Sequence, residues 1–304
     1  MADDFLTSDD VVSDEQSFYN VVRLTGNGMT PFWDSLNDAE AFDGNPATGH
    51  IWYQTPDATA GETNAHNEGS IRADVEGATE VELRNHLQIF KRSYGVTGSQ
   101  AASKSKVVAS LLERSKDRSI KQLRLDVEKA LMSATAPVQR VGNTVAGVMG
   151  GVLHYCTEVI DATNTVELSA KAHIKAPLRT MWENGVLEDK IILCGGDVKD
   201  SISTLLDGFK TANNNETAYV GNVSKIKDVG WATNVEVKVS TQLAANEMLI
   251  YAPELINPIL LRQKKDASVT DPAYDSEAWE NLFELTLQVL DPYAAVHVKN
   301  IKIV

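Results

Sequence analysis

Two cysteines, six histidines and a surplus of carboxylates are the residues of this 304-residue chain that could do chemistry. His154 and Cys156 are two positions apart, so a strand would place both on one face, and with Cys194 they could form a thiolate–imidazole site. The favoured alternative is that both thiols are small buried hydrophobic groups. Cys194 lies in an apolar run, and nothing nearby in the sequence would lower its pKa. We therefore expect no catalytic residues.

Carboxylate pairs such as Asp9–Asp10 and Glu188–Asp189 could act as general acid and base. Because 42 Asp and Glu residues outnumber 28 Lys and Arg residues, such pairs arise by chance, and a solvated surface is the favoured interpretation. The sequence contains no P-loop, no dinucleotide fingerprint, no HExxH and no other paired histidine spacing. We expect no cofactor and no metal ion, and only a weak cation site in segment 57–68 stays open.

Composition excludes several classes of protein. The net charge of −14 argues against a nucleic-acid reader, which would present a basic face. Two unpatterned cysteines predict no disulfide framework. The acidic start of the chain predicts no secretory signal, and no apolar run approaches the roughly 20 residues of a membrane span. A hydrophobic content of 43% suffices for one large or two modest domains.

The first 79 or so residues lack sustained hydrophobic periodicity. Ile51–Tyr53 predicts a short strand, and segment 57–70 is nearly all small or polar. Residues 79–93 then alternate as one long strand, with Val81, Leu83, Asn85, Leu87 and Ile89 on one face. Pairing these strands makes an extended hairpin without a core of its own, which must lie on something else to be ordered. In a chain without a catalytic motif, we expect the supporting surface to be another copy of the same protein; the competing interpretation is a disordered acidic N-terminus and an ordinary hairpin.

The remainder of the chain predicts an α+β fold. Residues 99–134 have the clearest helical periodicity, with an interruption at Ser115–Ser119 that could kink the helix. Two further helical stretches, 166–176 and 178–184, are divided by Pro177. A second amphipathic helix is expected over 197–209. Strands are expected at 191–194, 235–239, 248–251, 259–261, 285–289 and 296–303, in a mixed or antiparallel sheet to which the middle and the end of the chain contribute.

The order of these features, together with short motifs, resembles a known family. The motifs are Thr30-Pro31, His50-Ile51-Trp52, Asn64–Gly69, Arg84–Phe90, Val96–Gln100, Leu125–Glu128, Trp182–Gly185, Ile191-Ile192, Lys199–Ile202, Leu260–Arg262, Glu284–Leu287, Pro292 and Ala294. In this order and spacing, they are similar to the major capsid (major head) proteins of tailed bacteriophages with the Hong Kong 97-type fold. The resemblance covers about Thr30 to Val304. It departs from the family at Asp228-Val229-Gly230 and finds no match before Thr30.

The resemblance implies a division of the chain. Residues 1–45 would be the N-terminal arm and 46–98 the extended loop (E-loop) that lies over a neighbouring subunit. Residues 99–141 plus 233–304 would form the peripheral domain with its long spine helix, and 142–232 the axial domain. In the Hong Kong 97 phage a lysine and an asparagine cross-link subunits; residues 46–81 contain no lysine here, so we expect no such cross-link from the loop.

The implied function is a structural one, not an enzymatic one. The protein would assemble in the host cytoplasm, as pentamers and hexamers, into the icosahedral head of the virion, enclosing phage DNA without sequence-specific binding and without a membrane. A portal protein would be a partner. The family match begins about 30 residues after Met1, so we expect a separate scaffolding protein instead of a large cleavable N-terminal one. Candidate subunit contacts are the apolar Trp52 and Tyr53 and the charged Arg72, Arg84 and Arg92.

Two alternatives stay open. A bacterial encapsulin-type compartment shell shares the implied fold, and a cargo-binding pocket beside an N-terminal helix would favour it. An acidic α+β enzyme using Cys194 or a carboxylate pair is the other, and loss of an activity in a Cys194→Ala variant that still assembles would favour it.

Overall fold

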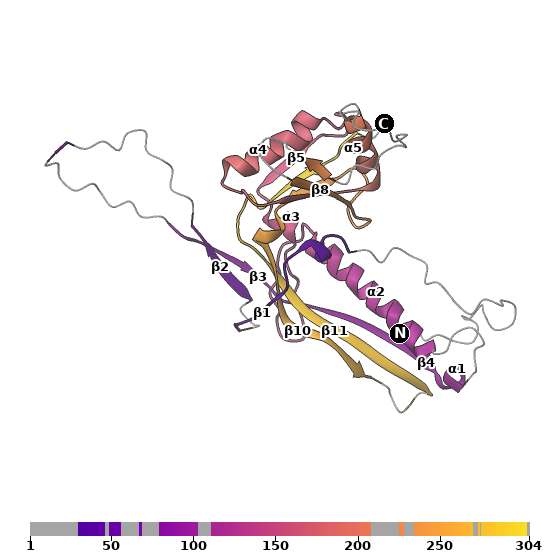
Figure 1. Cartoon of the computed structure of the whole chain (residues 1–304). Coiled ribbons are helices and arrows are strands. Elements are labelled where there is room, and N and C mark those ends of the chain that lie inside the picture. Colours follow the sequence, from indigo (N-terminus) through magenta and orange to yellow (C-terminus); the bar gives the residue numbers. More distant parts are fainter. Residues whose placement is uncertain are drawn as a thin grey trace.

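The computed structural model describes residues 30–45, 49–55, 67–68, 79–102, 111–207, 225–227, 234–269, 273 and 275–302. Within these residues, two modules are each built on a sheet of their own, and a two-stranded hairpin projects away from both (Figure 1). The fold is therefore mixed α and β, as the sequence predicts. Among the described helices, none is both long enough and apolar enough to cross a bilayer.

A four-stranded sheet forms the first module of the described chain. Its strands lie in the order β1 (Glu40–Ala41), β10 (Ile256–Ser268), β11 (Ser276–Val289) and β4 (Gln88–Thr97). The three longer strands are antiparallel, and β1 runs parallel to β10. After the short helix α1 (Gly98–Ala102), helix α2 (Leu111–Leu131) packs along β4 and β11 and buries Leu123, Val127 and Leu131. Their spacing of four residues places these side chains on one face of the helix.

A six-stranded mixed sheet forms the second module. Its described strands lie in the order β5 (Glu158–Asp161), β12 (Ala295–Lys299), β9 (Met248–Tyr251), β6 (Lys190–Cys194), β8 (Asn234–Val239) and β7 (Lys225–Lys227). Strands β6 and β9 are buried at every position, as expected for central strands covered on both faces. Helix α4 (Ala176–Glu183) contacts β12, and helix α5 (Gly196–Asp207) contacts β8.

The two modules meet in a continuous apolar core. It joins Leu123 and Val127 of α2 with Leu249 and Tyr251 of β9. Two chain crossings run side by side at this joint: one includes the 3₁₀ turn η4 (Pro253–Leu255), and the other is segment 290–294. The Leu290 amide donates to the Leu255 carbonyl at 2.9 Å, and the Ala252 amide donates to the Ala294 carbonyl at 2.9 Å. These bonds keep the two crossings adjacent.

The strand expected over residues 79–93 is wrong as a single element. Strand β3 (Val81–Asn85) pairs with β2 (His50–Gln54), whereas β4 pairs with β11, and His86 and Leu87 interrupt the ladder. The interruption arises because the Asn85 side-chain oxygen accepts a hydrogen bond from the His86 amide at 2.9 Å, a local bond that competes with strand pairing. The alternation also changes phase here, since Phe90 is buried in place of Ile89.

Several predicted helices differ in extent. Helix α2 continues through Ser115–Ser119 without a break, and residues 103–110 lie outside the described residues. Residues 166–169 are not helical; a π-helix (Ala170–Lys175) instead leads directly into α4, whose first turn contains Pro177. The backbone is helical on both sides of Pro177, so the proline does not divide two helices.

Strand pairing does not follow the expected boundary between residues 232 and 233. Strands β8, β9 and β12, which come after that boundary, lie in the same sheet as β5 and β6. Strands β10 and β11 lie with β4 in the other sheet. The C-terminal third of the chain therefore contributes to both modules.

Candidate subunit-contact surfaces

The hairpin β2–β3 is the element that extends furthest from both modules in Figure 1. Its five residue pairs run antiparallel from His50 opposite Asn85 to Gln54 opposite Val81. An isolated two-stranded hairpin is at best marginally stable in water, so its root must be held by the rest of the subunit. The contacts at that root decide which of its residues are available to a neighbour.

Trp52 is the principal anchor of the hairpin root. Its indole N–H donates to the Val289 carbonyl at 2.8 Å, and its ring stacks on His50 and tilts against Tyr155. Gln54 donates to the carbonyls of Val289 and Leu290 at 3.2 and 3.0 Å. Because Trp52 is only 5% exposed, it packs within its own subunit.

Asn85 anchors β3, the other strand of the hairpin, at the root. Its amide nitrogen donates to the carbonyls of Gly150 and Leu287 at 2.9 and 2.7 Å, and its oxygen accepts from the Gly150 amide at 2.8 Å. The side chain is fully buried. Sequence reasoning did not single out this residue, although a polar side chain at an apolar position of an alternating strand was the available signal.

The remaining contact candidates lie in different settings. Tyr53 is 61% exposed and lies opposite Glu82, on the face of the hairpin away from Trp52 and Gln54. Arg84 pairs with Glu82 of the same strand at 3.0 Å, and Arg92 makes a two-pronged pair with Asp126 of α2 at 2.7 and 3.0 Å. Arg72 lies outside the described residues. The two described arginines thus already have partners within the subunit, and exposed pairs of this kind contribute little to stability.

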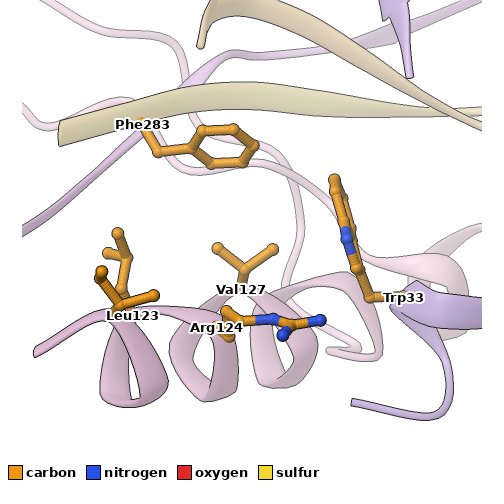
Figure 2. Close-up of a pocket in the computed structure, with 6 residues that line it drawn as sticks. Trp33, Leu123, Arg124, Val127 and Phe283 are labelled. Carbon is orange, nitrogen blue, oxygen red and sulfur yellow. The ribbon is translucent and has the colours of Figure 1, made fainter. Parts of the chain in front are cut away.

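An apolar groove lies beside α2, on the side of the four-stranded sheet that carries the helix. Figure 2 shows Trp33 and Phe283 above Leu123 and Val127 of the helix, with Arg124 alongside. The two aromatic rings meet edge to face, with centroids 6.1 Å apart. The volume of the groove is about 220 Å³.

The thiolate–imidazole site expected as an alternative does not form. Residues Val152–Tyr155 are a helical turn, α3, and not the strand that would align His154 with Cys156. The Cys156 thiol donates to the Ala295 carbonyl at 2.8 Å, and burial raises its pKa to about 12. Burial likewise raises the pKa of Cys194 to about 11, although Lys199 opposes the shift. Neither thiol is set up as a nucleophile.

Metal-binding side chains are also dispersed. In the ranges that the structure describes, no three His, Cys, Asp or Glu residues are grouped so as to hold a metal ion. Most of the acidic segment 57–68, where a weak cation site stayed open, lies outside those ranges.

A family model for the SU10 major capsid protein matches residues 5–302. The chain belongs to this family. It is a major capsid protein of the tailed-phage type, assembled from repeated subunits in the capsid of a virion. The match begins well before Thr30, so it also covers most of the arm for which the sequence offered no motif.

Solved structures support the same fold. The capsid of cyanophage A-1(L) matches with a TM-score of 0.65 and 14% identity, covering 97% of this chain and 98% of that one. The capsid of cyanophage P-SCSP1u matches with a TM-score of 0.64 and 13% identity, covering 93% and 92%. The SrpI encapsulin of Synechococcus elongatus is also similar, with a TM-score of 0.54, 10% identity and coverage of 92% and 93%. Among curated protein sequences, none matches.

Proposed function

We propose that the outer surface of the β2–β3 hairpin binds a neighbouring subunit in the capsid shell. The observation that supports this is the division of the hairpin: Trp52, Gln54 and Asn85 lie on one face and hold its root, whereas Tyr53, on the opposite face, stays exposed. An exposed aromatic residue on a rigid strand loses little conformational entropy when it becomes buried, which is why such residues dominate many interfaces. Arg72, Arg84 and Arg92 then act as rim charges that set register more than affinity.

The domain division follows from this proposal. Residues 1–45 act as the arm, 46–98 as the E-loop, and the two modules as the peripheral and axial domains. The sheet topology supports a modification of the expected boundary, in which strands β8, β9 and β12 belong to the axial domain. The same subunit then occupies pentamers and hexamers, with the hairpin adapting and the two sheets staying rigid.

Other finer points belong to the same proposal. The shell forms in the host cytoplasm with a portal protein and a separate scaffolding protein. It encloses DNA without sequence-specific binding. The protein has no catalytic activity. The buried, protonated thiols support the last point. Purification of heads followed by mass spectrometry of their components tests the partners.

A Tyr53→Asp variant tests the contact surface. The substitution leaves the root intact, so the isolated subunit should keep its circular dichroism spectrum, whereas the yield of shells seen by light scattering and negative-stain microscopy should fall at least about 10-fold, the effect of losing a contact of roughly 1.4 kcal/mol. Tyr53→Phe, which keeps the ring, is the matched control and should assemble normally. Normal shells from Tyr53→Asp would refute this role of the hairpin.

A further inference from the structure

Residues Thr30–Ala41, which we call the strap, cross the joint between the two modules. The strap begins on α2, where the Glu128 carboxylate accepts hydrogen bonds from the Phe32 and Trp33 amides at 2.9 and 2.8 Å. Glu128 is fully buried and 96 positions from Phe32, so this is a long-range cap on the 3₁₀ turn η2 (Trp33–Ser35). Outside this buried pair of bonds, Asp34 of the strap pairs with the exposed Arg124 at 2.9 Å.

The middle of the strap contacts the second module. The Phe32 ring is fully buried and packs on Tyr251 of β9, with centroids 4.9 Å apart. The hydroxyls of Ser35 and Tyr251 are 2.6 Å apart. Phe32 thus fills the shared core where α2 and β9 meet, and its backbone is bonded to one module while its ring packs on the other.

The end of the strap returns to the first module. The Asn37 amide group lies 3.5 Å from the Glu254 carbonyl of the crossing, and β1 then pairs with Ile259 and Leu260 of β10. A short segment therefore touches, in order, α2, β9, the crossing and β10. Movement of one module relative to the other would have to break some of these contacts.

The hairpin root is attached at the same joint. Trp52 and Gln54 bond to the carbonyls of Val289 and Leu290, where the second crossing begins. The direction in which the hairpin leaves the subunit is therefore tied to the position of this crossing.

We propose that the strap is a conformational lock: when it is docked on Glu128 and Tyr251, it holds the angle between the two modules and, through the crossing, the direction of the hairpin. This inference rests on the proposed function for its consequence, because a subunit that serves rings of five and of six needs a defined but adjustable shape. Such a joint responds in discrete steps, since packed cores resist continuous deformation.

Glu128→Gln and Tyr251→Phe are the variants that test the lock. Glutamine replaces one acceptor oxygen by a donor that faces a backbone amide, and Tyr251→Phe removes only the hydroxyl that bonds Ser35. Arg124→Gln is the matched control, because it removes an exposed charge pair on the same helix and leaves the buried bonds intact. Tyr251→Phe keeps the test valid should Glu128→Gln fail to fold.

The readout is the distance between spin labels on exposed positions of the two modules, Lys121→Cys on α2 and Lys175→Cys before α4. At pH 7.5 the unaltered strap and the Arg124→Gln control should give one narrow distance distribution. Glu128→Gln and Tyr251→Phe should broaden or shift it, with faster amide exchange over 30–36. A distribution identical to the control, despite faster exchange of the strap, would overturn the lock.

Shell geometry distinguishes this inference from the proposed function. If the lock operates in assembly, both strap variants should give shells with a wider spread of diameters than the control. If Tyr53→Asp assembles normally while the label distances of the strap variants respond as expected, the proposed function of the hairpin fails and the lock stands. If shells form with unaltered diameters in both variants, the strap does not set subunit shape and the inference fails.

Discussion

Asn85 provides the sharpest test of how the hairpin is held. Its buried side chain makes four hydrogen bonds, to the Gly150 amide and carbonyl, the Leu287 carbonyl and the His86 amide. A net contribution of about 1 kcal/mol for each bond predicts that Asn85→Ala lowers the free energy of unfolding by roughly 4 kcal/mol. The loss should be largest at the hairpin root, because the freed groups of Gly150 and Leu287 are those that hold the end of β3 to the rest of the subunit.

Asn281 is the matched control for this substitution. It is the same residue type and equally buried. Among the described residues, however, its amide nitrogen bonds only the Ser119 hydroxyl, at 3.2 Å, and its oxygen has no hydrogen-bond partner. Asn281→Ala should therefore cost about 1 kcal/mol.

Denaturant unfolding of the unassembled subunits, followed by tryptophan fluorescence, gives both free energies. Amide exchange over residues 81–90 locates the effect, which should be large in Asn85→Ala and small in Asn281→Ala. Equal costs for the two substitutions would refute the reasoning that hydrogen bonds at Asn85 hold the root.

Three further predictions concern buried ionisable groups. Glu284 is 1% exposed and lies 2.6 Å from both Arg140 and Arg262, so Glu284→Gln should lower the free energy of unfolding in denaturant by about 2 kcal/mol. Glu167→Gln, which breaks the exposed pair with Lys302, is the control and should lower it by under about 0.5 kcal/mol. Similar losses for the two variants would contradict this prediction. At pH 8, native Cys194 with a pKa of about 11 should be about 10⁻³ thiolate, so iodoacetamide should label both cysteines far more slowly than in the unfolded chain; rapid native labelling would contradict the burial of the thiols. Burial raises the pKa of Glu128; the charge of Asp34 adds to this shift, whereas the Trp33 and Phe32 amides and Arg124 oppose it. The native carboxyl therefore holds its proton more tightly than the unfolded chain does. Its contribution to stability is present at low pH and is lost as the pH rises through the raised pKa. Relative to Glu128→Gln, the unaltered protein should thus lose stability as the pH rises through that range, and parallel pH–stability curves for the two proteins would show that Glu128 titrates normally.

Local pattern alone was enough for most elements. Helix α2, strand β6 and helix α5 were predicted from the spacing of their apolar residues, because a buried stripe recurs every three to four residues in a helix and a central strand is apolar throughout. The pairing of the strand around Ile51–Tyr53 with a strand after the polar stretch was also predicted, although that second strand was expected as one long element over 79–93. The order and spacing of short motifs predicted the capsid-protein family, and the match over residues 5–302 confirms this prediction.

Tertiary structure decided what pattern could not. Alternation ran unbroken through Asn85 in the sequence, yet the strand ends there, because the Asn85 side chain bonds the His86 amide locally and also bonds Gly150 and Leu287, 65 and 202 positions away. Trp52, expected at a subunit contact, is an internal anchor for the same reason: its indole finds a carbonyl 237 positions distant. Periodicity reports which face of an element is apolar, whereas the partner that covers the face, and the polar group that meets each buried donor, depend on contacts far apart along the chain.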